Sequence, residues 1–324
     1  MPVRLGFIGT GGIAGMHFRN LEQIKDANIV ALTDIVRDKA EAAAAKFDAN
    51  AYTDFNKMLT SEDLDAVYIC IRPGDHGAPE FACIKHGVPM FIEKPVGADV
   101  ETLRKVRAGI QRKKLITAVG YQDRYLDIVE RMKKFLDGRG VGMIKGYWMG
   151  GMPGVMWWRQ KKLSGGQHVE QTTHTFDMAR YLFGDVKRVA AVASKGLMTE
   201  HEKYDIQDAS AVHLEFASGL VGTIFSACFL QAGGGKVGID IYGKDFYIEY
   251  QGRRSISINR KNKTEVFRNT NNSTLIEDQT FIDAVLSGDG SKIRSPYADA
   301  AKSAAVSIAA SDSLKSGNFE KVKL

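Results

Sequence analysis

The sequence Leu5-Gly6-Phe7-Ile8-Gly9-Thr10-Gly11-Gly12-Ile13-Ala14 decides the fold of this chain. An apolar strand runs directly into the pattern G-x-G-x-x-A and then into a helical segment. In such a pattern Gly9 makes the turn, Gly11 lets the backbone approach a pyrophosphate, and Ala14 allows the helix to pack closely on the strand. Gly12 and Ile13 stand at the helix N-terminus, whose unpaired N–H groups and positive dipole end attract phosphates. The stretch therefore predicts a dinucleotide-binding site.

An acidic residue, Asp34, closes the second predicted strand, twenty residues after Ala14. A carboxylate at this position can accept both hydroxyls of the adenosine ribose. It would also repel a 2′-phosphate, so NAD is the expected cofactor and NADP the less favoured one. Arg37 lies close enough along the chain to contact a 2′-phosphate, so NADP remains an alternative cofactor. A glycine-rich turn without a ligand is the simpler alternative, but Asp34 and the place in the first strand–helix unit favour the cofactor.

The first 120 residues alternate short apolar runs with helix-period segments, which is typical of a doubly wound parallel sheet. We expect strands over 3–8, 29–33, 66–71, 90–92 and 115–119, with helices over 14–24, 37–47, 79–86 and 100–112. The later part reads as helices over 125–136 and 165–183, then strands from 186 to 267 with hairpins at 217–219 and 243–245, then helices over 276–286 and 296–313. The sequence thus predicts a Rossmann dinucleotide-binding domain at 1–120. It also predicts a substrate-binding and oligomerisation domain at 121–324, built as an α/β domain on a large, mostly antiparallel, open-faced sheet.

The composition is that of an ordinary globular protein. The 324 residues include 44 Lys+Arg and 38 Asp+Glu, a formal charge of +6 that lies almost wholly beyond residue 120 and is scattered along the chain. Scattered basic residues without a recognition motif argue against nucleic-acid binding. No stretch approaches the ~20 apolar residues of a membrane span. The N-terminus lacks the apolar core of a secretory signal, so a cytoplasmic location is expected. Cys70, Cys83 and Cys228 form no C-x-x-C pair, so neither a disulfide framework nor a metal site is expected.

Two further patterns carry chemistry. Glu93-Lys94-Pro95 follows the strand at 90–92, which puts Lys94 at the strand end where doubly wound sheets bind ligands. Glu170, His174 and Asp177 are spaced i, i+4 and i+7, so on a helix they share one face. Taken alone, Lys94 is more simply explained as a surface lysine, and the spacing of Glu170, His174 and Asp177 as a solvated helix face. The presence of a dinucleotide motif in the same chain favours the functional explanation of both patterns.

These motifs together resemble the glucose-fructose oxidoreductase / inositol dehydrogenase / MocA family of pyridine-nucleotide sugar and polyol oxidoreductases. The resemblance extends over essentially the whole chain. It rests on the glycine loop, Glu93-Lys94-Pro95, Gly165-Gly166 before Glu170-x-x-x-His174-x-x-Asp177, Val119-Gly120-Tyr121-Gln122-x-Arg124 and Tyr181-Leu182-Phe183-Gly184. It implies that Lys94 lies beside the nicotinamide and that His174 faces it.

Oxidation of a secondary alcohol needs one group to accept the hydroxyl proton and another to stabilise the developing alkoxide. His174 suits the first role and the Lys94 ammonium the second. A carboxylate on the imidazole would fix its tautomer and raise its basicity. The family usually has an aspartate where Glu170 stands, so it stays open whether Glu170 orients His174 or binds the substrate.

Further candidate residues flank these motifs. Ile71 ends the predicted strand over 66–71, and Arg72 and His76 lie in the loop after it. These residues are expected to border the nicotinamide ribose, although Arg72 departs from the family's usual Thr-Pro. Trp158 can line a sugar pocket or belong to the core, and His17 and His86 read as structural. The candidate cofactor contacts are Gly9, Gly11, Gly12, Ile13, Ala14, Asp34, Arg37, Ile71, Arg72, His76, Glu93, Lys94 and Gln122. The candidate substrate contacts are Lys94, Arg124, Trp158, Arg159, Glu170, Thr173, His174 and Asp177, and Lys161, Lys162, His168 and Gln171 are further possible contacts to hydroxyls or carboxylates.

The sequence therefore predicts an NAD-dependent enzyme that interconverts a secondary hydroxyl and a ketone on a sugar, glycoside or cyclic polyol. A redox-neutral NAD-dependent enzyme of the glycosidase or epimerase type is one alternative, and a non-catalytic nucleotide sensor is another. An exposed sheet face needs covering, so a homodimer or homotetramer is expected.

Overall fold

The computed structural model describes residues 1–324, which form two compact units. The first unit comprises Met1–Gly97, Glu101–Tyr125 and Asn272–Ala301. The second comprises Ala98–Val100, Leu126–Asn271 and Lys302–Leu324. The segment Asn272–Ala301 belongs with the first unit because apolar side chains of its helix, including Phe281 and Ile282, complete that unit's core.

The first unit contains a six-stranded sheet in the order β3-β2-β1-β4-β5-β6. Every neighbouring pair in it is parallel. The strands are β1 (Val3–Ile8), β2 (Ala27–Thr33), β3 (Asn50–Tyr52), β4 (Ala66–Ile69), β5 (Met90–Ile92) and β6 (Thr117–Val119). This order is that of the Rossmann fold, with the reversal between β1 and β4. The predicted doubly wound parallel sheet is confirmed.

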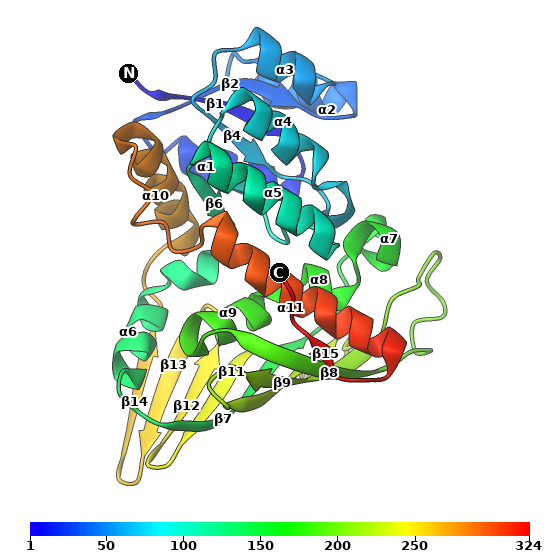
Figure 1. Ribbon diagram of the computed structural model, residues 1–324, viewed down its shortest axis with the longest axis vertical. Coiled ribbons are helices and arrows are strands. Elements are labelled where there is room, and N and C mark those ends of the chain that lie inside the picture. The colour runs from blue at the N-terminus through cyan, green and yellow to red at the C-terminus, as the bar shows by residue number, and fades with distance from the viewer. The chain divides into compact units, whose positions relative to one another are not determined.

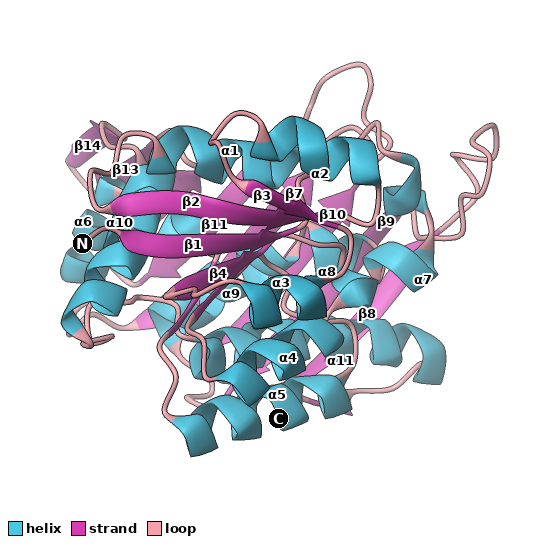
Figure 2. Cartoon of the chain, turned by 90° about the horizontal axis from the view of Figure 1, so that it is seen from above, coloured by secondary structure: helices cyan, strands magenta, loops and turns pink.

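Helices cover both faces of this sheet. They are α1 (Gly12–Leu21), α2 (Arg37–Ala44), α3 (Phe55–Ser61), α4 (Ala78–His86), α5 (Val100–Lys113) and α10 (Ser273–Ser287). Figure 2 shows α1 and α2 on one side of β1 and β2, and α3, α4 and α5 on the other. The short β3 and α3 carry too few residues for a periodic pattern, and the sequence did not predict them.

Aromatic rings fill the centre of the first unit. Phe7 of β1 and Tyr68 of β4 are register partners, as are Tyr68 and Phe91 of β5. Their rings stack at centroid distances of 4.8 and 4.7 Å. Phe281 of α10 meets Tyr68 and Phe91 edge-on at 5.6 Å. These fully buried rings hold the strand ends that carry the candidate site.

The second unit is built on a nine-stranded sheet in the order β14-β13-β12-β11-β7-β10-β9-β8-β15. All neighbours are antiparallel except β7 and β10. The strands are β7 (Val141–Met149), β8 (Val186–Ser194), β9 (Ala209–Phe216), β10 (Val221–Ala227), β11 (Lys236–Gly243), β12 (Phe246–Gln251), β13 (Ser255–Arg260), β14 (Lys263–Arg268) and β15 (Glu320–Lys321). The predicted large, mostly antiparallel sheet is confirmed.

One face of this sheet is covered and the other is open. Side chains of α6 (Asp127–Leu136), α9 (Thr173–Phe183) and the later part of α11 (Tyr297–Ser316) share a core with the covered face, and Figure 1 shows α9 lying against it. On the open face Val221 and Phe225 of β10 are exposed, while Ile224 between them is buried. Two short helices, α7 (Lys161–Ser164) and α8 (Gln167–Glu170), precede α9. No helix of the protein is both long and apolar enough to span a bilayer.

Candidate functional site

The glycine loop between β1 and α1 has the shape that a phosphate-binding turn requires. Gly9 has φ +93°, and a Cβ there would lie 2.3 Å from the carbonyl oxygen of Cys70, so only glycine fits. Gly11 caps α1, and a Cβ on Gly11 or Gly12 would meet no atom within 4 Å. The open space before the first turn of α1 is where a pyrophosphate would approach the backbone N–H groups. The buried Ala14 packs α1 onto the sheet.

Exposed apolar side chains surround this loop. Ile13 is 37% exposed, and Ile35 and Val36, directly after β2, are 84% and 43% exposed. Exposed apolar groups beside a polar loop are suited to contact the flat rings of a dinucleotide. The sequence prediction included Ile13 but missed Ile35 and Val36, although an apolar pair directly after Asp34 was a visible signal.

Asp34 is held in place at the end of β2. Its Oδ2 accepts hydrogen bonds from Thr10 N at 3.1 Å and Thr10 Oγ1 at 2.9 Å, and its Oδ1 accepts one from Val36 N at 3.0 Å. Partial burial opposes ionisation, but the hydrogen bonds from Val36 and Thr10 outweigh it and lower the pKa of Asp34. An ionised carboxylate fixed beside the glycine loop fits the adenosine ribose of NAD. Arg37 is exposed on α2 and pairs with Glu41.

The loop after β4 contains a 3-10 helix, Pro73–Asp75. Arg72, just before it, pairs with Asp75 at 2.6 Å, so this guanidinium is engaged locally. His76, just after it, bonds Glu80 Oε1 through Nδ1 at 2.5 Å, and its buried Nε2 has no hydrogen-bond partner. Ile71 is half-buried at the start of the loop.

Lys94 follows the end of β5 in the first unit. Its backbone N–H donates to Glu93 Oε2 at 3.0 Å, and Glu93 itself is buried. Gln122 is buried in the 3-10 helix Gln122–Tyr125. In that helix Arg124 donates to the Arg294 carbonyl at 2.6 Å and pairs with Asp299 at 2.7 Å. Arg124 therefore connects this 3-10 helix to the segment Asn272–Ala301 within the first unit.

His174 lies in the first turn of α9 in the second unit. Its ring is nearly buried and stacks on Trp148 of β7, with centroids 5.2 Å apart. Thr173 beside it is fully buried. Asp177 Oδ1 accepts a hydrogen bond from the hydroxyl of Ser303 at 2.6 Å, and the same hydroxyl oxygen accepts a hydrogen bond from Arg180. Asp177 therefore links α9 to α11 within this unit.

The prediction of one helix over 165–183 is wrong, because the segment is interrupted. Gly165 and Gly166 adopt φ of +76° and +87°, and α8 ends at Glu170 before α9 begins at Thr173. Glu170 and His174 therefore lie on two different helices. Glu170 Oε2 accepts a hydrogen bond from Trp158 Nε1 at 2.7 Å.

The remaining candidates of the second unit surround Trp158. That side chain is 1% exposed and packs in a small cluster with Ile206 and Cys228. Arg159 is half-buried, and its Nε has no hydrogen-bond partner. His168 bonds Ser210 Oγ at 2.5 Å, and burial with the nearby Lys161 charge lowers its pKa to about 4, so it is neutral. Lys161 and Lys162 lie in α7 and Gln171 directly follows α8; Lys162 is exposed, and the other two are partly exposed.

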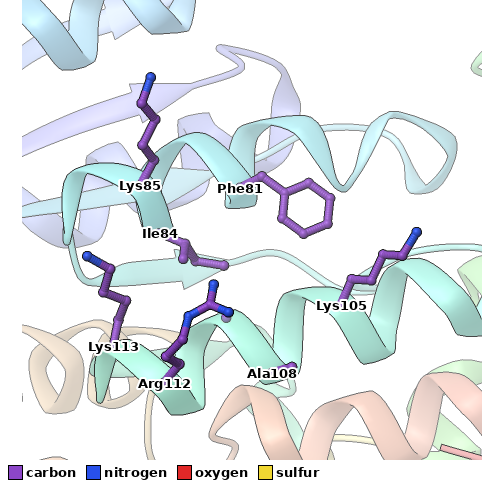
Figure 3. Close-up of a pocket in the computed structure, with 8 residues that line it drawn as sticks. Phe81, Ile84, Lys85, Lys105, Ala108, Arg112 and Lys113 are labelled. Carbon is purple, nitrogen blue, oxygen red and sulfur yellow. The ribbon is translucent and has the colours of Figure 1, made fainter.

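Two further observations concern sites of other kinds. No group of three or more His, Cys, Asp or Glu side chains is arranged to hold a metal ion, and the three cysteines are free and buried. A groove of about 590 Å³ lies between α4 and α5 (Figure 3), and it contains none of the candidate residues. Basic side chains, among them Lys105 and Arg112, surround its apolar floor of Phe81 and Ile84.

Two family models match the chain. Residues 3–121 match the oxidoreductase family with an NAD-binding Rossmann fold, and residues 139–249 match the GFO/IDH/MocA C-terminal domain. Myo-inositol 2-dehydrogenase of Thermotoga maritima is 27% identical over 234 residues, which is 68% of this chain and 67% of that protein. Inositol 2-dehydrogenase of Rhizobium meliloti is 27% identical over 261 residues, 80% of this chain and 78% of that protein.

A solved structure resembles the whole chain. Levoglucosan dehydrogenase in complex with NADH and levoglucosan has a TM-score of 0.88 and is 18% identical, and the match covers 100% of both chains. At this identity the likeness shows a common fold.

Proposed function

The chain is an NAD-dependent oxidoreductase of the GFO/IDH/MocA family, and we propose that it interconverts a secondary hydroxyl and a ketone on a cyclic polyol or sugar. The observation that carries this proposal is Lys94 at the end of β5, its backbone bonded to Glu93, in the unit that also holds the glycine loop. The relatives named inositol 2-dehydrogenase favour a ring that carries several hydroxyls. NAD, when bound, supplies the acceptor for the hydride that leaves the substrate carbon.

We propose that residues of the first unit bind NAD. Gly11, Gly12 and the first turn of α1 would receive the pyrophosphate, and Asp34 would accept the ribose hydroxyls. The open space at both glycines and the fixed carboxylate support this assignment. His76 supplies a ring nitrogen without a protein partner, which suits a contact with the nicotinamide half.

We assign the proton chemistry to His174 and Lys94. The imidazole would take the proton of the reacting hydroxyl, and the ammonium would stabilise the alkoxide that develops. The stack on Trp148 restricts the orientation of the His174 ring, which supports a role that needs a fixed direction.

We assign Glu170 to the binding of the substrate. The bond from Trp158 fixes the Glu170 carboxylate. A fixed carboxylate can accept hydrogen bonds from substrate hydroxyls. Arg159, whose Nε has no partner, supplies a donor for an oxygen of the substrate.

A substrate screen tests the proposal. Purified protein is mixed with NAD and with inositols, neutral sugars, glycosides or uronates, and NADH is followed by its absorbance. We expect stoichiometric NADH with at least one polyol or sugar. Conversion of a substrate without net NADH would point to the redox-neutral alternative, and tight NAD binding without turnover of any class would point to a sensor.

A further inference from the structure

A buried polar cluster lies directly behind the backbone of Lys94. It joins His17 of α1, Glu93 at the end of β5 and Asp278 of α10, which are 0%, 2% and 0% exposed. His17 Nδ1 bonds Asp278 Oδ1 at 2.7 Å, and His17 Nε2 bonds Glu93 Oε1 at 3.1 Å. The sequence prediction gave His17 a structural part only.

The cluster is fixed from every side. Asn20 Nδ2 donates to Asp278 Oδ2 at 2.8 Å, so both oxygens of Asp278 are engaged. The rings of Tyr68 and Phe91 lie 5.2 and 4.8 Å from the His17 ring. The other acidic neighbour is Glu277, which is 1% exposed. With these neighbours the imidazole has a single orientation.

The charges in the cluster balance around His17. Burial by itself would lower the pKa of His17, but the attraction and hydrogen bonds of Asp278, and then of Glu93, raise it to about 10. His17 is therefore an imidazolium between two carboxylates. Burial, together with the charges of Glu93 and Asp278, raises the pKa of Glu277 well above its usual range, so that Glu277 stays neutral.

Glu93 transmits this arrangement to Lys94. Its Oε1 bonds His17, and its Oε2 accepts the backbone N–H of Lys94 at 3.0 Å. A Cβ on Gly120 would lie 2.4 Å from Glu93 Oε1, so the glycine provides the space for the carboxylate. The Glu93 side chain is thereby held by two hydrogen bonds, and one of them comes from the backbone of the candidate catalytic lysine.

Stability alone does not explain why His17, Glu93 and Asp278 are charged and buried together. Replacing such groups by apolar side chains of similar volume is often neutral or stabilising, whereas removing one partner leaves a buried charge. A hydrogen-bonded set of this kind is of more use where it orients a functional group. Here α1, which carries the glycine loop, is tied to the strand end that carries Lys94.

We propose that His17, held by Asp278, is a positioning residue that fixes Lys94 through Glu93 relative to the glycine loop. The inference rests on the proposed role of Lys94. Small displacements of a positioned group are costly in rate, so loss of His17 lowers turnover without removing a group that touches the substrate.

A double-mutant cycle tests this proposal. With a substrate found in the screen, His17→Gln is expected to lower kcat roughly 10- to 100-fold, as loss of an orienting partner does, while the Kd of NAD changes by less than about twofold. In a Lys94→Ala background the same substitution causes no further loss, because its effect passes through Lys94. His86→Gln, at an exposed histidine of α4, is the matched control and leaves kcat unchanged.

A second variant guards against misfolding of the first. Asp278→Asn keeps the shape of the side chain and removes its charge, and it is expected to give the same pattern with a smaller loss. The ¹⁵N signals of the His17 ring supply an independent readout. They are expected to show both ring nitrogens protonated at pH 8 in the wild type. In Asp278→Asn the imidazolium is expected to lose a proton at a lower pH than in the wild type.

The outcomes separate the two ideas. If the losses from His17→Gln and Lys94→Ala multiply, or if His17→Gln weakens NAD binding with kcat unchanged, the positioning role is wrong and the role of Lys94 stands. If Lys94→Ala keeps the wild-type kcat, the proposed role of Lys94 fails and the inference fails with it.

Discussion

Asp34 and Glu93 show how two carboxylates at the ends of parallel strands acquire different tasks. Asp34 stays partly exposed, and hydrogen bonds from Thr10 and Val36 aim it at the space beside the glycine loop. Glu93 is buried, and its oxygens bond His17 and the backbone of Lys94. One carboxylate can reach a ligand, whereas the other acts only through its neighbours.

Lys94→Ala separates binding from chemistry. We expect kcat to fall roughly 100-fold, because the alkoxide loses its stabilising charge, and the Kd of NAD to remain close to wild type. Steady-state kinetics and fluorescence titration with NADH measure the two quantities. Turnover near that of the wild type would refute the role assigned to Lys94.

Asp34→Asn tests the choice of cofactor. The substitution keeps a side chain of similar shape but removes the charge that repels a 2′-phosphate. We expect the ratio of kcat/KM for NAD to that for NADP to fall roughly tenfold, the loss of one charge-assisted hydrogen bond. Asp38→Ala, at an exposed carboxylate on α2, is the control. An unchanged ratio in Asp34→Asn contradicts the ribose contact.

At the scale of elements, glycines decide where helices start. The two left-handed glycines Gly165 and Gly166 end α7 and start α8, and a Cβ on Gly165 would lie 2.7 Å from Val169. At the nucleotide loop, Gly9 is needed for the backbone itself, whereas Gly11 has an ordinary φ of −71° and open space around it. The two loop glycines therefore have different reasons to be glycine.

The pair Gly9→Ala and Gly11→Ala separates these reasons. We expect Gly9→Ala to lower the free energy of unfolding by about 1–3 kcal/mol, because φ is positive and the carbonyl of Cys70 blocks the Cβ. Gly11→Ala is expected to unfold at the wild-type temperature but to bind NAD at least roughly tenfold more weakly, since its methyl group occupies the approach of the pyrophosphate. Thermal unfolding and NAD titration of both variants check this. A wild-type affinity for NAD in Gly11→Ala would contradict the proposal that the pyrophosphate binds at Gly11.

For the molecule as a whole, the open face of the nine-stranded sheet is the feature without a partner in a single chain. Met143, Val221, Phe225 and Phe319 line a shallow hollow of about 390 Å³ on it, and all four are at least 37% exposed. Apolar patches of this kind commonly mark interfaces. We propose that a second copy of the chain covers this face, in a homodimer or a homotetramer.

Phe225→Glu tests this assembly. A charge in the middle of the face is expected to shift the mass measured by light scattering to that of the 35.6 kDa monomer. Leu286→Glu changes an apolar residue on α10 that is even more exposed than Phe225, and it is expected to leave the mass unchanged. A wild-type protein that is itself monomeric at micromolar concentration would contradict the proposal.

The sequence by itself determined the Rossmann sheet, the glycine loop with Asp34 and the mostly antiparallel second sheet. These features depend on local periodicity and on turn residues, which a short stretch of chain specifies. Only the tertiary structure decided what the polar side chains contact. His17 meets Asp278 across 261 residues of sequence, and Arg124 is engaged by Arg294 across 170. Trp158 fixes Glu170 from outside its helix. No periodic pattern encodes such pairs, because each arises where separate elements pack together and a buried polar group has to find a partner.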